Sequence, residues 1–77
     1  MPHIIVKMLP GRTPTQKQAL ADALTRATIE SLGSQDKSIS VAVEDVPDEE
    51  WNEKVYFPDI KAKPDQIYKK PGYGPED

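Results

Sequence analysis

The sequence contains no cysteine and only one histidine, His3. The lack of cysteine excludes disulfides, thiolate zinc sites and thiol catalysis, and a single histidine cannot form a multi-histidine metal site. The longest apolar runs, such as Ile4–Val6, have three residues, whereas a membrane-spanning helix needs about 20. Neither a membrane span nor a signal segment is predicted, and the expected location is the cytoplasm.

A strongly basic balance is also missing. The net charge is −3, with lysines and acidic residues interspersed, so no nucleic-acid partner is expected, because such binding requires a basic face. A chain of 77 residues forms one small domain that buries only about 60% of its extended surface. Domains of this size usually gain stability from disulfides, a metal or a partner chain. Self-association is therefore predicted.

One long helix is predicted over residues 14–32. Thr13 is suited to the N-cap, Pro14 to the first helical position, and Gln16 to the third position of a capping box. Gly33 supplies a C-terminal stop. Apolar and small residues recur at three- and four-residue steps along the predicted buried face: Leu20, Ala23, Leu24, Ala27, Ser31 and Leu32.

Two β-rich segments, 2–9 and 38–44, flank this helix. The order strand, helix, strand predicts an α/β fold made of a single βαβ unit with parallel strands and a right-handed crossover. Parallel sheets are normally covered on both faces, yet one helix covers only one. Both faces of the first strand carry apolar residues, so the other face, with Ile5 and Leu9 or with the alternate residues Ile4, Val6 and Met8, is expected to meet another chain. Oligomerisation would then complete the sheet.

The remaining segment, 45–77, is rich in proline. It is predicted to contain a short helix near 48–54, whose acidic residues are favourable at a helix N-terminus, and one or two turns over 64–70. The whole chain, 1–77, is thus expected to form a single domain with a βαβ core over 1–44 and a C-terminal segment of short helical turns.

Pro2 is the first candidate for chemistry. Removal of Met1 would turn its nitrogen from an inert amide into a secondary amine, anchored at the start of a strand. To act as a base near neutral pH, this amine needs a depressed pKa, which burial or a nearby cation supplies. A guanidinium about 6 Å away would lower the pKa by roughly two units. The alternative is that a proline at position 2 only protects or rigidifies the N-terminus.

The chain has two arginines, Arg12 and Arg26. Arg26 falls on the polar face of the predicted helix and is expected to be a solvated charge. Arg12 follows the first strand, in the turn before the helix. It is either an ordinary loop charge or a bidentate ligand for a substrate carboxylate.

Taken together, Met1-Pro2, a β-strand, Pro10-Gly11-Arg12, a capped helix and Ser38-Ile39-Ser40-Val41 resemble the 4-oxalocrotonate tautomerase superfamily. The resemblance covers nearly the whole chain. The tail over 67–73 is similar to the phenylpyruvate-tautomerase-type branch.

The resemblance implies a cofactor-independent, cytoplasmic isomerase that interconverts enol and keto forms of a 2-oxo acid. Pro2 would be the general base, and Arg12 would bind the substrate carboxylate and keep Pro2 unprotonated. Trp51 lies where the family often has an aromatic residue in the active-site wall; a core or interface anchor is the other interpretation. The expected assembly is a homodimer, with a hexamer as the alternative.

The chain departs from the hexameric prototype on the second strand, where Ser40 stands in place of an arginine. A serine cannot replace a guanidinium that stabilises an enolate, so monocarboxylates of the phenylpyruvate type fit better than dicarboxylates. Ser40 is retained as a candidate for substrate binding. Lys69 or Lys70 would either fold back to supply positive charge or remain solvated.

Two other functions stay open. One is a catalytically weak or non-catalytic homo-oligomeric domain of the same fold. The other is a dehalogenase or hydratase relative, in which a protonated Pro2 works with a carboxylate from Glu44 or Asp45; the missing second arginine weighs against it. His3 is interpreted as a strand or interface residue without a catalytic role.

Overall fold

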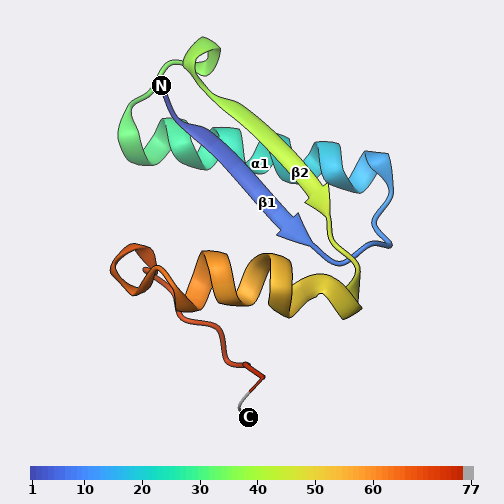
Figure 1. Cartoon of the computed structure of the whole chain (residues 1–77). Coiled ribbons are helices and arrows are strands. Elements are labelled where there is room, and N and C mark those ends of the chain that lie inside the picture. The colour runs from blue at the N-terminus through green and yellow to red at the C-terminus, as the bar shows by residue number, and fades with distance from the viewer. Residues whose placement is uncertain (76–77) are drawn as a thin grey trace. The chain divides into compact units, whose positions relative to one another are not determined.

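The computed structural model describes residues 1–75; Glu76 and Asp77, the end of the predicted C-terminal segment, lie outside the described residues. The chain forms two compact units, one over Met1–Asp45 and one from Val46 on. The first unit contains β1 (His3–Met8), α1 (Pro14–Leu32), η1 (Asp36–Ser38) and β2 (Ser40–Asp45) (Figure 1). The second contains η2 (Asp48–Glu50), η3 (Asn52–Lys61) and η4 (Pro64–Gln66).

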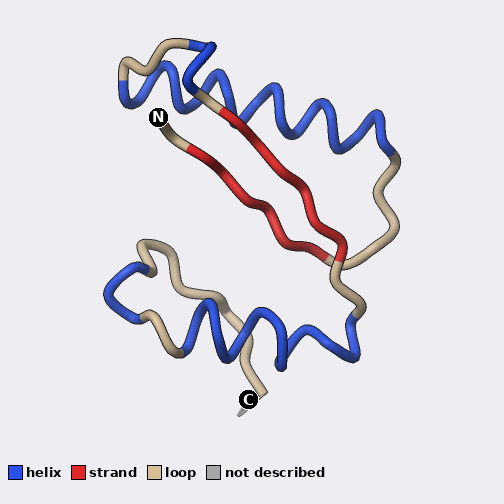
Figure 2. The backbone as a smooth tube through the Cα atoms, turned by 45° about the horizontal axis from the view of Figure 1, so that its top comes forward, coloured by secondary structure: helices blue, strands red, loops and turns tan. Residues whose placement is uncertain are grey.

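The first unit is the predicted βαβ unit. Strands β1 and β2 pair in parallel, from His3 opposite Ser40 to Met8 opposite Asp45. Helix α1 lies across one face of this two-stranded sheet, and both views show it running back from the carboxyl ends of the strands toward their amino ends (Figures 1 and 2). The fold class is confirmed.

Helix α1 begins and ends at the predicted residues. The Thr13 hydroxyl accepts a hydrogen bond from the Gln16 backbone N–H at 3.1 Å, and the Gln16 side-chain oxygen accepts one from the Thr13 backbone N–H at 2.9 Å. This reciprocal capping box satisfies two N–H groups that the first turn would otherwise leave unpaired. Gly33 closes the helix at φ 70°, a left-handed conformation that suits glycine.

The half-buried face of α1 differs from the predicted one. Leu20 and Leu24 lie on it as expected, but the other small residues of the predicted stripe are exposed, and threonines take their place. The hydroxyls of Thr25 and Thr28 donate to the carbonyls of Ala21 and Leu24 at 2.8 and 2.7 Å. Because these bonds satisfy the hydroxyl groups, threonine can occupy a half-buried helix face. The exposed members of the predicted stripe are Ala23, Ala27, Ser31 and Leu32.

The sheet face opposite α1 carries exposed apolar side chains. Ile5 is 56% exposed, and Leu9, just after β1, is 39% exposed. No side chain of Met1–Asp45 is fully buried. A unit with so little buried apolar surface gains stability by covering this face, in line with the predicted self-association.

The second unit is more helical than the sequence indicated. The predicted helix over 48–54 captures only its beginning, because η3 continues to Lys61 as a π-helix with Pro58 inside. Val46 and Val55 are the buried apolar side chains of this unit. The turn η4 falls within the segment 64–70 predicted to form turns. Among residues 1–75, no helix has the length and apolar character to cross a membrane.

Candidate functional site

Pro2 lies at the amino end of the sheet, immediately before the first residue of β1, and is half-buried. Its carbonyl oxygen accepts a hydrogen bond from the Ser40 backbone N–H at 3.2 Å. The strand ladder therefore extends to Pro2 itself. A prolyl amine generated here would sit on an anchored backbone, and Met1, which is fully exposed, is the residue whose removal would generate it.

Ser40 also makes a side-chain contact beside Pro2. Its hydroxyl lies 2.7 Å from Nδ1 of His3, the residue opposite it in the strand register. A hydroxyl both donates and accepts hydrogen bonds, so it can pair with this nitrogen whether or not the nitrogen carries a proton. We refer to the two Ser40 bonds, to the Pro2 carbonyl and to the His3 ring, as the Ser40 clamp.

The sequence interpretation missed the contribution of His3 to this clamp. The contact depends on the register that places His3 opposite Ser40. Alternation along each strand shows which residues share a face, but it does not reveal how far one strand is shifted along the other. Once the parallel register is known, the pair is the expected cross-strand neighbour.

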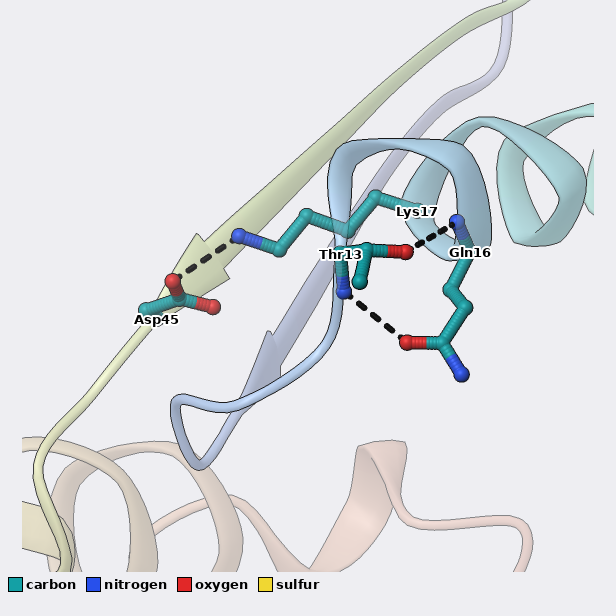
Figure 3. A network of polar contacts seen from close by, with 4 residues as sticks. All are labelled: Thr13, Gln16, Lys17 and Asp45. Atoms are coloured by element: carbon teal, nitrogen blue, oxygen red, sulfur yellow. Dashed lines mark hydrogen bonds and ion pairs between the residues drawn. The ribbon is translucent and has the colours of Figure 1, made fainter.

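Arg12 lies at the opposite end of the sheet, beyond the carboxyl end of β1. It is exposed in the loop between β1 and α1, next to Gly11, whose φ of 128° is one that side-chain-bearing residues rarely adopt. The ammonium of Lys17, in the first turn of α1, lies 2.8 Å from the Asp45 carboxylate at the carboxyl end of β2 (Figure 3). This ion pair holds the start of α1 to the carboxyl end of β2, and Arg12 lies two residues before Pro14, the first residue of α1.

Pro2 and Arg12 are therefore not neighbours within one chain. The six residues of β1 separate them, and five steps of about 3.3 Å put the ends of the strand roughly 16 Å apart. Within one chain Arg12 therefore has little effect on the Pro2 nitrogen, because a charge at that distance is largely screened.

Trp51 belongs to the second unit, between η2 and η3, and is half-buried. Its indole N–H donates to the hydroxyl of Tyr73 at 3.1 Å. The aromatic residue singled out from the sequence is thus linked to the C-terminal tail. In that tail Lys69 and Lys70 are both exposed, and Lys70 lines a groove of the second unit.

Within residues 1–75, no group of three or more His, Asp or Glu side chains is arranged to hold a metal ion. Three kinds of group in the first unit could take part in chemistry. The chain's N-terminal amine and the imidazole–hydroxyl pair of His3 and Ser40 lie at the amino ends of the strands, and the guanidinium of Arg12 lies beyond their carboxyl ends. These groups serve proton transfer and carboxylate binding.

Comparison with known proteins connects these features to a family. The family model described as "Tautomerase enzyme" matches residues 2–53. A "Probable tautomerase" from Xylella fastidiosa is 49% identical over 74 residues, which cover 96% of this chain and 90% of the relative. "Tautomerase PptA" from Cronobacter sakazakii is 42% identical over 74 residues, covering 95% of this chain and 97% of the relative.

A solved structure is similar as well. TomN is described as a 4-oxalocrotonate tautomerase homologue in the tomaymycin biosynthetic pathway. It matches with a TM-score of 0.63 and 44% sequence identity, over 65% of this chain and 77% of that one.

Proposed function

The chain belongs to the 4-oxalocrotonate tautomerase family, and from this premise we propose that it interconverts enol and keto forms of a 2-oxo acid without a cofactor. Pro2 is the general base once Met1 has been removed. The observation that carries the proposal is the position of Pro2, hydrogen-bonded through its own carbonyl to β2, because a base must be held in place relative to the proton that it moves.

The proposed reaction is a proton transfer between two atoms of the same substrate. The neutral amine of Pro2 takes a proton from a dienol oxygen or from the carbon next to a ketone and returns it at the other position, so that no net proton is gained or lost. A positioned general base of this kind contributes about 10²–10⁴-fold to the rate.

Self-association supplies what one chain lacks. When two strands related by a two-fold axis pair antiparallel, the amino end of each lies beside the carboxyl end of the other. Such a pairing would bring Pro2 of one chain toward Arg12 of its partner and would join two parallel pairs into a larger sheet. A homodimer is the smallest assembly that does this, and a hexamer is the alternative.

In this arrangement Arg12 would bind the substrate carboxylate in bidentate fashion and favour the neutral form of the Pro2 amine. Ser40 supplies no second cation, which favours monocarboxylates of the phenylpyruvate type. Trp51 would exclude water from the substrate and stack on an unsaturated or aromatic group.

The dehalogenase or hydratase alternative finds less support in the first unit. It requires a carboxylate to activate water, and Asp45 is engaged with Lys17 at 2.8 Å. Glu44 is exposed on β2, but no second arginine stands on that strand to polarise a substrate, because Ser40 takes the position and Arg26 lies exposed on α1.

The first test is intact mass followed by an assay. We expect the purified protein to lack Met1 and to accelerate ketonisation of the enol of phenylpyruvate, measured by loss of enol absorbance. A processed chain that leaves this rate at the buffer value would instead support the non-catalytic oligomeric domain.

Ser40 is expected to position Pro2 rather than to bind substrate. Ser40→Ala should lower kcat about two- to tenfold and leave KM unchanged, because one hydrogen bond contributes about 0.5–1.5 kcal/mol and the backbone bond to Pro2 remains. Steady-state kinetics on the enol would measure both constants. A raised KM with unchanged kcat would assign Ser40 to substrate binding.

His3→Ala removes the other half of the same contact and serves as the matched variant. Because the two side chains form one interaction, the double variant should be no slower than the slower single variant. Ser31→Ala, at an exposed position of α1, should leave both constants unchanged. Fully additive losses for His3 and Ser40 would contradict a shared positioning role.

A further inference from the structure

The second unit contains a groove of about 250 Å³. Its walls are formed by two tyrosine rings, Tyr56 and Tyr73, by the aliphatic side chains of Ile60 and Ile67, and by prolines; Lys61 and Lys70 also line it. All of these residues belong to η3, to η4 or to the tail that follows. Drug-sized ligands occupy pockets of about 300–1,000 Å³, so this groove fits a smaller molecule.

The aromatic wall is fixed by contacts on both sides. The rings of Tyr56 and Tyr73 lie 6.1 Å apart between centroids, at an interplanar angle of 49°. Tyr56 also meets Phe57 edge to face at 5.3 Å. The Tyr73 hydroxyl accepts the indole N–H of Trp51 at 3.1 Å. These contacts hold two ring faces in place, and such a wall suits a planar, unsaturated ligand.

The charged side chains that line the groove are all positive. Two lysines contribute to it and no acidic residue does. The ammonium of Lys61 lies over the Phe57 ring, 5.6 Å from its centroid. Lys70 is exposed and has no hydrogen-bond or ion-pair partner in the described part of the chain. An apolar, aromatic groove with an exposed lysine among its lining residues is complementary to an organic anion.

We propose that this groove binds a small aromatic carboxylate, with its ring against Tyr56 and Tyr73 and its carboxylate paired with Lys70. A single-ring acid matches the volume, the aromatic wall and the charge together. Binding requires no proton transfer, so the proposal does not depend on the role of Pro2.

Titration with phenylacetate tests the proposal. Trp51 is the only tryptophan and is bonded to a residue that lines the groove, so its fluorescence should change in a saturable manner. Because Trp51 is also proposed to stack on the substrate of Pro2, NMR rather than fluorescence identifies the place of binding. Amide shifts in ¹⁵N-resolved NMR spectra should concentrate on residues of η3 and the tail. Phenylacetamide, which has the same ring but no charge, should bind about two- to fivefold more weakly.

The neighbouring lysines provide a matched pair of variants. Lys70→Ala should weaken phenylacetate binding about two- to fivefold, a modest factor because the ammonium is exposed. Lys69→Ala, which removes the same charge outside the groove, should bind as the unchanged protein does, and so should Pro2→Ala. Equal losses in the two lysine variants would show nonspecific attraction and overturn the proposal.

Two other results would overturn it as well. One is the absence of saturable binding, as expected if a second copy of the chain covers the groove. The other is a set of NMR shifts confined to β1 and β2. Neither result bears on turnover at Pro2, so the groove and the proposed tautomerase activity stand or fall separately.

Discussion

Replacement of Pro2 by alanine in the processed protein is expected to lower kcat/KM for enol ketonisation by about 10²–10⁴-fold, the range that a positioned general base contributes. Alanine is also small enough for Met1 to be removed, so the variant differs mainly in its terminal amine. That amine is primary and less basic than a prolyl amine, and it lacks the ring that fixes the nitrogen. We therefore expect the loss to fall toward the lower end of the range.

An extended chain, with one residue retained before Pro2, distinguishes the effect of the free amine from the effect of the proline ring. It keeps the proline but converts the nitrogen into an amide, which cannot accept a proton, so the loss should be larger than in Pro2→Ala. Its carbonyl can still accept the bond from Ser40, and unfolding curves should match those of the processed protein. Equal turnover by the processed, extended and alanine forms would remove Pro2 from the mechanism.

The pH–rate profile adds a signature that a structural role would not produce. Because the neutral amine is the base, kcat/KM should rise with pH through the ionisation of that amine, which a neighbouring guanidinium would move to lower pH. The ionisation should be absent from the extended form. A rise that persists there would assign it to another group.

The second large effect concerns Arg12. Arg12→Ala is expected to lower kcat/KM by about 10–100-fold, since hydrogen bonds to a charged group contribute about 1.5–3 kcal/mol. Arg26→Ala, which removes the only other arginine and lies exposed on α1, is the control and should leave kcat/KM unchanged.

Mixing the two damaged chains tests whether the site is shared. If Pro2 and Arg12 act from different chains, a dimer of one Pro2→Ala chain and one Arg12→Ala chain contains one intact site and one doubly damaged site. Random assembly of equal amounts makes about half of the dimers mixed, so about a quarter of the normal activity should return after the chains are unfolded and refolded together. If the refolded mixture were no more active than the two variants measured separately and added together, a shared site would be contradicted.

Much of the first unit could be predicted because its signals are local. Thr13, Pro14 and Gln16 mark the start of α1, and Gly33 marks its end; each residue acts on its own turn of backbone. The order of elements then determines that the strands are parallel. The same argument predicts that one face of the sheet is uncovered, whereas the structure identifies it as the face with Ile5.

The parts that could not be predicted depend on contacts between distant segments. The stripe through Ala23 and Ala27 was wrong because alanine is compatible with either face of a helix, whereas the threonines that occupy the half-buried face satisfy their hydroxyls locally. The pairing of His3 with Ser40 required the register. The position of Arg12 and Pro2 of one chain at opposite ends of β1 also required the bounds of that strand.

The second unit was predicted least well. Acidic residues near Asp48 indicated a helix start, but nothing in the sequence signalled that helical backbone would continue through Pro58, a residue that usually ends or kinks a helix. The bond between Trp51 and Tyr73 spans 22 positions. No periodic pattern of side chains reveals a contact of that kind.

The length of β1 has a consequence for how activity would depend on the amount of protein. If the base, Pro2, and the residue that binds the carboxylate, Arg12, lie at opposite ends of one six-residue strand, an isolated chain contains no complete site. It contributes one residue to each of two sites that form only when two chains pair. Turnover would then follow the number of paired chains, which at low concentration rises with the square of the total. Dilution alone would switch the protein off, and a cell would gain activity faster than it gains chains.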